Sequence, residues 1–432
     1  MKESGRGLAI AFLCLAAVQQ ARADALQDTR TLADQGNPAA QTLLGLDYAQ
    51  GQGVAKDDVQ ALTWLRRAAR QGDAAAQYYL GVAYDSGEGV RANPRVAMRW
   101  YEQAAARHFA AAANNLGFHY KVGLGTKRNA RQAASWFEQA AQQGDQAGQT
   151  NLAALYDTGE GVPRNLTKAV YWYAKAAAQG DVVAQSRLAT HYKDGTGVAK
   201  NLTLAAEWYQ RAADQGDAFT QDQLGHLYET GEGVTQDARQ AAEWYGKAAA
   251  QGQVDAEKQL AGLYSSGQGV AQDSGLAALW YKKAAVQGDA VAQTDLAVAY
   301  DTGTGVAQDY DKAAYWSQKA ATQGDAVAQN NLAILYYYGR GVPQNNRLAA
   351  SWFAKAARHG YAEAQMSLGL LYQNGQGVPV DFVKAYVWLA LAAANGEAPA
   401  AAARDALAGR MAASDLANAQ AKAHAGIFPD GP

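Results

Sequence analysis

The ten tryptophans of this 432-residue chain occur at a constant interval of 36 residues, from Trp64 to Trp388. A single globular core has no reason to place one residue type at a fixed interval, whereas a repeat protein places it once in each structural unit. Each unit of such a protein buries its apolar face by stacking on its neighbours. The interval therefore predicts ten repeats over residues 36–395, which form one elongated body instead of several globular domains.

Each repeat begins with the signals of a first helix. We number the positions of a repeat from 1 to 36, with Gly36 at position 1 of the first repeat. In the eighth repeat Asp289, at position 2, is a residue type that caps helix N-termini. Leu296 at position 9 and Tyr300 at position 13 then fall on one helical face, and these two residue types recur in all ten repeats.

A Gly-x-Gly motif and a second helix complete the repeat. Gly303 and Gly305 end the first helix of the eighth repeat, because glycine adopts the positive φ angles of a helix C-terminus. Position 22 is Asp or Asn in every repeat, which predicts an N-cap, and Trp316 with Ala320 follows on the second helix. The predicted fold is all-α: an α/α superhelical solenoid of ten helical hairpins.

The two ends of the chain differ from the repeats. Residues 1–23 combine Lys2 and Arg6 with a short apolar stretch and small residues at a cleavage site, which indicates a signal peptide. The apolar stretch is shorter than the ~20 residues that a transmembrane helix needs. We therefore expect an exported chain, periplasmic or secreted, with no membrane span after cleavage. Residues 24–35 are expected to form an N-terminal capping helix, and residues 396–432 C-terminal capping helices and a tail.

Several classes of function lack their sequence signals. The net charge of −2 and the absence of basic runs argue against nucleic-acid binding. The Gly-x-Gly motifs lack the strand and third glycine of a dinucleotide site, and the acidic residues beside them lack the late Glu of a calcium loop. No Ser-x-x-Lys, Gly-x-Ser-x-Gly or His-Glu-x-x-His motif occurs. We expect no enzyme activity, no cofactor and no metal.

The repeat pattern G-D-A-x-A-Q-x-x-L-A-x-x-Y-x-x-G-x-G-V-x-x-D-x-x-x-A-x-x-W-Y-x-K-A-A-x-Q resembles the Sel-one-like repeat family (SLR), a relative of the tetratricopeptide repeat. The resemblance covers residues 36–395. It implies a non-catalytic scaffold or adaptor that binds protein partners in the bacterial cell envelope. An alternative comes from cysteine-rich exported relatives in Helicobacter, for which penicillin binding or β-lactamase activity has been proposed. Those relatives carry a disulfide in each repeat, whereas the mature chain here has no cysteine.

Residues that select a partner are expected where the repeats vary. Positions 4, 7, 8, 11, 12, 14 and 15 of the first helix vary, and in related solenoids this helix lines the concave side. Polar side chains gather there in the third to sixth repeats: Asn115, His119, Asn151, Arg187, His191, Gln223 and His226. We hypothesise that they bind a peptide or a cell-wall glycan by hydrogen bonds. The alternative is an ordinary solvated surface. His119 and His191 lie two repeats apart, too far for one metal ion.

Two tyrosines form a second candidate binding surface. Tyr337 and Tyr338 occupy positions 14 and 15, where the repeat does not require an aromatic residue. Aromatic side chains with a polar tip are enriched at recognition sites. The alternative is packing against the Gly339–Gly341 turn. The sequence as a whole predicts a monomer that binds protein, peptide or glycan partners.

Overall fold

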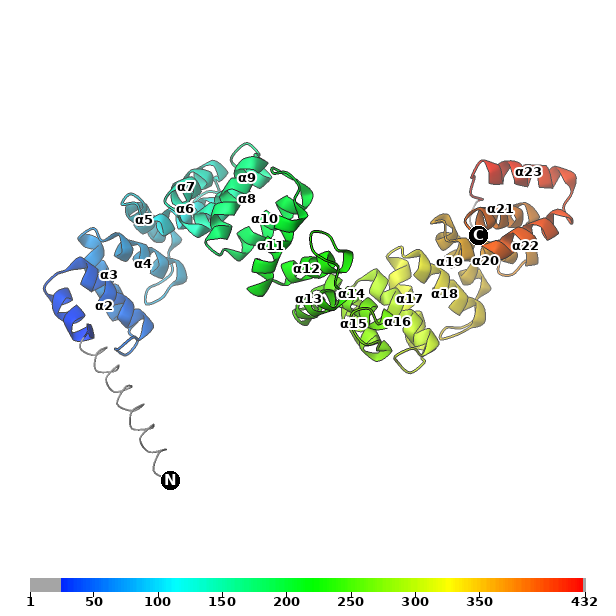
Figure 1. Cartoon of the computed structure of the whole chain (residues 1–432), viewed down its shortest axis with the longest axis horizontal. Helices are drawn as coiled ribbons and strands as arrows, with labels where there is room; N and C mark the ends of the chain where they lie inside the picture. The colour runs from blue at the N-terminus through cyan, green and yellow to red at the C-terminus, as the bar shows by residue number, and fades with distance from the viewer. Residues whose placement is uncertain (1–24, 430–432) are drawn as a thin grey trace, which may run out of the picture. The chain divides into compact units, whose positions relative to one another are not determined.

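The computed structural model describes residues 25–429, and every regular element in that range is a helix. The signal peptide predicted for residues 1–23 lies outside the described residues. Contacts divide the chain into two compact units, Met1–Gln215 and Gly216–Pro432. Within each unit the helices pack as consecutive antiparallel hairpins (Figure 1). The predicted all-α solenoid of ten 36-residue repeats is confirmed.

The first unit contains five hairpins. Residues 25–34 form a helix that precedes them. The hairpin helices are α2 (Pro38–Gln50), α3 (Asp58–Arg70), α4 (Ala74–Ser86), α5 (Pro94–Ala105), α6 (Ala110–Val122), α7 (Ala130–Gln142), α8 (Gln146–Thr158), α9 (Leu166–Ala178), α10 (Val182–Asp194) and α11 (Leu202–Asp214). Even-numbered helices are the first helices of the repeats, and odd-numbered helices are the second helices.

The second unit contains five further hairpins and two terminal helices. The hairpin helices are α12 (Ala218–Thr230), α13 (Ala238–Ala250), α14 (Val254–Ser266), α15 (Ser274–Val286), α16 (Ala290–Thr302), α17 (Tyr310–Thr322), α18 (Ala326–Tyr338), α19 (Asn346–Arg358), α20 (Ala362–Asn374) and α21 (Phe382–Ala394). The terminal helices are α22 (Ala398–Ala408) and α23 (Ala413–His424). Both pack against α21.

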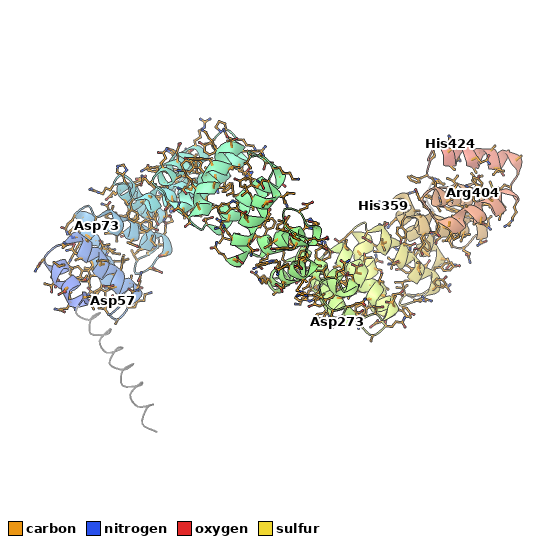
Figure 2. The ribbon with its side chains drawn as sticks, in the orientation of Figure 1. Asp57, Asp73, Asp273, His359, Arg404 and His424 are labelled. Atoms are coloured by element: carbon orange, nitrogen blue, oxygen red, sulfur yellow. The ribbon has the colours of Figure 1, made fainter. Side chains whose placement is uncertain are left out.

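Asp and Asn side chains begin most of the helices. The Asp57 side chain accepts hydrogen bonds from the backbone N–H groups of Val59 and Gln60 at the start of α3. Asp73, labelled with Asp57 in Figure 2, caps α4 by accepting a hydrogen bond from the backbone N–H of Ala76. The position 22 residue caps the second helix in all ten repeats. Each cap satisfies N–H groups that the helix itself leaves open.

The two glycines of the Gly-x-Gly motif have different roles. Gly303 has a φ of 75° and ends α16 by donating its N–H to the carbonyl of Ala299, 2.9 Å away. Gly305 also has a positive φ, and the backbone carbonyl of Ser274 in the preceding repeat occupies the space that a Cβ atom would need. The second glycine therefore permits the turn and also lets the backbones of two neighbouring repeats approach closely.

Buried glutamines connect neighbouring hairpins. The Gln149 Nε2 atom at position 6 donates to the carbonyl of Ala141 in the preceding repeat, at 3.3 Å. Its Oε1 atom accepts from Gln179 at position 36 of its own repeat, at 2.8 Å. The same pair of bonds is made by Gln41, Gln185, Gln293 and Gln365. These bonds satisfy polar groups inside the stack, so they stabilise one relative placement of adjacent hairpins.

In seven repeats the tryptophan on the second helix is followed one turn later by a Lys or Arg whose cation lies over the ring. Lys247 Nζ lies 3.5 Å from the centroid of the Trp244 ring, and Lys283 lies 3.7 Å from that of Trp280. The ammonium group covers the ring face that the core leaves uncovered. The tryptophan interval therefore reflects the packing of the solenoid.

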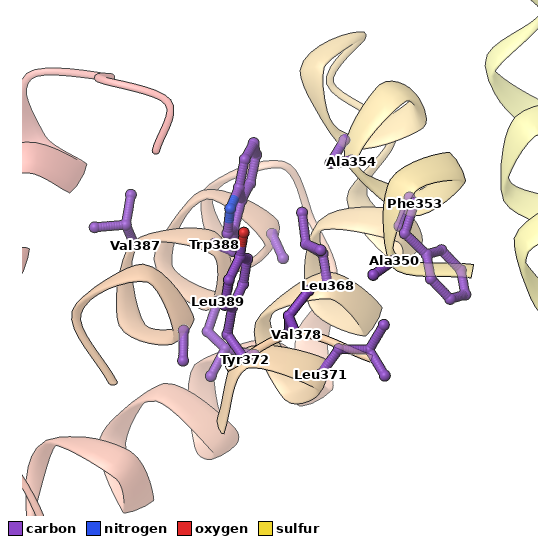
Figure 3. Close-up of a cluster of buried hydrophobic side chains, with 14 of the residues drawn as sticks. Ala350, Phe353, Ala354, Leu368, Leu371, Tyr372, Val378, Val387, Trp388 and Leu389 are labelled. Atoms are coloured by element: carbon purple, nitrogen blue, oxygen red, sulfur yellow. The ribbon is translucent and has the colours of Figure 1, made fainter. Parts of the chain in front are cut away.

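The last hydrophobic cluster closes the C-terminal end of the second unit. Figure 3 shows buried side chains of α20 and α21 in this cluster, among them Leu368, Trp388 and Leu389. The Phe428 ring stacks on Trp388 with centroids 5.6 Å apart. The terminal helices and this ring cover an apolar surface that no further repeat covers.

Candidate functional site

His119, one of the histidines expected on the binding face, is buried. Its exposed fraction is 2%. Its Nε2 lies 2.8 Å from Asp85 Oδ2, and its Nδ1 lies 3.0 Å from the carbonyl of Leu124. The hydroxyl of Tyr101 donates to the same Asp85 oxygen at 2.9 Å. Burial, followed by the negative charge of Asp85, raises the pKa of Tyr101.

His191 has an equivalent environment two repeats later. Its Nδ1 lies 2.8 Å from Thr196 Oγ1, and its Nε2 lies 3.7 Å from Asp157 Oδ2. The Tyr173 ring packs beside it, and burial together with the Asp157 charge raises the pKa of Tyr173 to about 12. The hypothesis that these two histidines contact a partner is therefore not supported, because both rings are buried and have intramolecular partners.

The remaining polar residues of that hypothesis do not form one cluster. Asn115 and Asn151 are half-buried, and Asn151 donates to Asn114 at 2.9 Å. Arg187 is exposed on α10. Gln223 is half-buried and His226 exposed, and both belong to the second unit. Within the first unit only the exposed Arg187 retains the full accessibility that the hypothesis requires.

A row of three cavities lies between consecutive hairpins of the second unit. Their volumes are about 260, 170 and 290 Å³. Val298 lines both the first and the second cavity, and Ile334 lines both the second and the third. We call these three cavities the pocket row. It follows the first helices of the eighth, ninth and tenth repeats, α16, α18 and α20.

The pocket row uses the repeat positions that the sequence indicates, in different repeats. Positions 8, 11 and 12 line its cavities through the following residues: Asp295, Val298, Ala299, Asn331, Ile334, Leu335, Ser367, Leu370 and Leu371. Of the residues that line the pocket row, the sequence predicts only Tyr337 and Tyr338 of the ninth repeat, because the prediction rests on polar and aromatic side chains. The signal that it overlooks is the small side chain of Ser317, which stands where the other nine repeats have Leu, Phe or Tyr.

The first cavity contains a carboxylic acid and a phenol. Asp295 and Tyr281 both line it, together with Ser265 and Ala299. Burial raises the pKa of Asp295 above its ordinary value. Burial, followed by the charge of Asp295, raises the pKa of Tyr281 to about 12. The phenol is therefore neutral at physiological pH and can donate a hydrogen bond.

Tyr337 and Tyr338 line the third cavity. The Tyr337 hydroxyl donates to Gln376 Oε1 at 3.2 Å, and the two rings meet edge to face with centroids 5.0 Å apart. Tyr338 is 60% exposed, so its ring is accessible. Glu363 adds a carboxylate to the same cavity. An aromatic pair beside a cavity of mixed polar and apolar lining is an arrangement that suits recognition.

Within residues 25–429, no three His, Cys, Asp or Glu side chains lie together as a metal ion would require.

None of the helices described in that range combines the length and the apolar composition needed to cross a bilayer.

Comparisons with known proteins place the chain in a family. The Sel1 repeat model matches ten consecutive segments, from residues 38–73 to residues 362–397. The crystal structure of a protective antigen present in uropathogenic Escherichia coli strains, which displays an SLR fold, is 36% identical and has a TM-score of 0.60. That match covers 93% of this chain and 94% of the antigen. A Sel1 repeat protein from Oxalobacter formigenes is 34% identical over 72% of this chain and 90% of its own, with a TM-score of 0.54. A search of curated proteins finds no match. The chain belongs to the Sel1 repeat family.

Proposed function

We propose that this chain is an exported, non-catalytic scaffold of the bacterial cell envelope, and that it binds an extended segment of a partner protein along the pocket row. Sel1 repeat solenoids typically serve as protein-interaction scaffolds. The observation that carries the proposal is the continuity of the pocket row, whose neighbouring cavities share Val298 and Ile334. Adjacent cavities along parallel helices suit successive side chains of one polypeptide.

The chemistry of the lining supports a polypeptide partner. Apolar side chains at positions 11 and 12 form the walls, and Asp295, Asn331 and Glu363 supply hydrogen-bonding groups. Recognition sites for proteins combine such apolar centres with a few polar groups. A cell-wall glycan presents mostly hydroxyl groups, and the more polar surface predicted in the first unit would suit it better.

A matched pair of variants tests the binding surface. Val298 is 42% exposed and lines two cavities, whereas Val291 on the same helix is 49% exposed and lines none of the three. The purified chain is used to capture proteins from the native envelope fraction, and mass spectrometry identifies them. We expect partners retained by wild type and Val291→Arg to be lost with Val298→Arg.

The alternative surface predicts the opposite ranking. If the polar residues of the first unit bound the partner, Arg187→Ala would release it and Val298→Arg would not. Retention of every captured partner by Val298→Arg would contradict the proposed function. Circular dichroism of the variants checks that each one folds.

Two further measurements address export and catalysis. The proposed export rests on residues 1–23, and N-terminal sequencing of protein from the periplasm or medium should begin near Asp24. A β-lactam turnover assay on pure protein tests the enzymatic alternative, which the relatives described above do not support. We expect no turnover.

A further inference from the structure

Position 30 of the repeat, on the second helix, normally carries a large side chain. Nine repeats have Leu, Phe or Tyr there: Leu65, Tyr101, Phe137, Tyr173, Tyr209, Tyr245, Tyr281, Phe353 and Leu389. The small residue at position 10 accommodates this side chain. A Cβ atom added to Gly225, for example, would lie only 2.7 Å from the Tyr245 ring. The exception is the eighth repeat, where position 30 is Ser317.

The exchange of a ring for a serine leaves a cavity. Ser317 is 1% exposed, and with Ala297, Ile334 and Leu335 it lines the 170 Å³ cavity at the centre of the pocket row. An engineered apolar cavity of about 150 Å³ in another protein is large enough to bind benzene. The cavity at Ser317, which we call the Ser317 pocket, is therefore large enough for one aromatic ring.

Besides Ser317, two polar side chains line the Ser317 pocket, Asp301 and Asn331. Asp301 lines the pocket from position 14, and its Oδ1 atom is buried with no hydrogen-bond partner among the described residues. A buried acceptor without a donor is unfavourable, so a ligand that brings a donor regains that free energy.

In two other repeats a tyrosine hydroxyl donates a hydrogen bond to the carboxylate at position 14. The Tyr101 hydroxyl donates to Asp85 at 2.9 Å, and the Tyr245 hydroxyl donates to Glu229 at 2.6 Å. In both repeats the phenol comes from position 30, the position that Ser317 occupies in the eighth repeat. The eighth repeat therefore keeps the acceptor and lacks the phenol.

We propose that the Ser317 pocket binds the side chain of a tyrosine in the partner polypeptide, with the ring between Ala297 and Leu335 and the hydroxyl donating to Asp301. This proposal rests on the proposed function and names one side chain that the partner must present. A phenylalanine would fill the same space and leave the Asp301 oxygen unpaired. The pocket thus discriminates between the two residues by a hydrogen bond to a buried carboxylate.

Small probes test the pocket directly on the full chain. The probe p-cresol is the tyrosine side chain without its backbone, and toluene is the same molecule without the hydroxyl. We expect p-cresol to bind about tenfold or more tightly than toluene, as measured by calorimetry or ligand-observed NMR. Equal affinity for both probes, or no binding of p-cresol, would overturn the proposal. Tighter binding of ethylguanidine would overturn it too, because the pocket would then be a cation site.

Two substitutions locate the p-cresol site. Ser317→Tyr restores the side chain of the other repeats, so it should raise the melting temperature and abolish p-cresol binding. Asp301→Asn keeps the space and weakens the acceptor, so p-cresol affinity should fall toward that of toluene. Unchanged p-cresol affinity in a folded Ser317→Tyr variant would place the probe elsewhere and contradict the proposal. If Ser317→Tyr does not fold, the Asp301→Asn variant tests the proposal instead, and unchanged p-cresol affinity in that variant would contradict it.

A competition experiment with peptides tests whether the pocket binds a tyrosine within a polypeptide or only a free phenol. The pentapeptide acetyl-Ala-Ala-Tyr-Ala-Ala-amide should displace p-cresol, and its phenylalanine counterpart should do so about tenfold less well. If p-cresol binds but the tyrosine peptide does not displace it, the pocket binds a small phenol, and the proposal of a tyrosine in a partner polypeptide is wrong. The proposed function fails on a different result, retention of partners by Val298→Arg, so the two failures are distinguishable.

Discussion

In eight of the ten repeats the second glycine of the Gly-x-Gly motif satisfies two constraints at once, a positive φ and a close approach of the backbone of the preceding repeat. Gly305 has both, whereas Gly288 has a φ of 105° and open space where a Cβ atom would lie. Gly288→Ala should therefore cost only backbone strain, about 1–2 kcal/mol. Gly305→Ala should cost more, because its Cβ also meets the backbone of Ser274 and overpacking adds about 1–3 kcal/mol.

Urea unfolding of the two glycine variants measures this difference. The φ of Gly305 is 74°, closer to the left-handed region that an L-residue tolerates than the φ of Gly288. Backbone strain alone would thus make Gly288→Ala the more damaging change. A larger loss of stability in Gly288→Ala would show that the contact between repeats is unimportant.

The carboxyl group of Asp295 should make stability depend on pH. Burial raises its pKa above the ordinary 3.8, so the folded chain holds this proton more tightly than the unfolded chain does. Its contribution to stability therefore falls as the pH rises from 3.8 through the folded pKa. Asp295→Asn should melt at a higher temperature than wild type at pH 7, and this difference should shrink as the pH falls through the folded pKa toward 3.8.

Asp309 provides a control of opposite sign. Its pKa is lowered by Lys312, whose ammonium lies 2.8 Å away, so its contribution is present at neutral pH and is lost on acidification. Asp309→Asn keeps an N-cap residue and should melt slightly lower than wild type at pH 7. Parallel pH profiles for the two variants would contradict the assigned directions.

At the scale of the helices, the buried glutamines at position 6 determine how one hairpin is placed on the next. Gln149→Ala removes a donor to the Ala141 carbonyl and an acceptor for Gln179. Because buried partners are then unpaired, we expect a loss of about 1–3 kcal/mol in the free energy of unfolding. Gln132→Ala, on the exposed face of α7, should change it by less than about 0.5 kcal/mol. Denaturant titration compares the two, and equal effects would exclude a role of the glutamines in stacking.

At the scale of the whole molecule, the apolar face of the last hairpin of a solenoid must be shielded from water by a terminal element. Val387, Trp388 and Leu389 on α21 are almost completely buried, and α22 and α23 pack against that helix. Deletion of residues 396–432 should expose this apolar surface, lower the melting temperature and cause self-association. Light scattering after size-exclusion chromatography measures the association.

A smaller change tests the same cover without truncation. Phe428→Ala removes only the ring stacked on Trp388, so it should lower the melting temperature less than the deletion and leave the association state of the wild-type chain unchanged. A truncated chain with the association state and the melting temperature of wild type would contradict a covering role for the terminal helices.

The fold could be predicted from the sequence alone, because a solenoid is built from contacts that recur once in every repeat. The tryptophan interval, the glycines that end each first helix and the position 22 caps act over a few residues or one repeat. Such short-range signals are visible in a linear pattern. The positions of the first helix that line cavities, 8, 11 and 12, were predictable for the same reason.

Which repeats contain a cavity could not be predicted from the sequence, because it depends on how side chains of neighbouring helices pack. His119 and Arg187 are both polar in the sequence, yet one is buried against Asp85 and the other is exposed. The Ser317 pocket depends on side chains from three helices, and a cavity is what remains after all of them have packed. A one-dimensional pattern records the small residue at position 30. It does not record whether a neighbouring side chain fills the space that the small residue leaves.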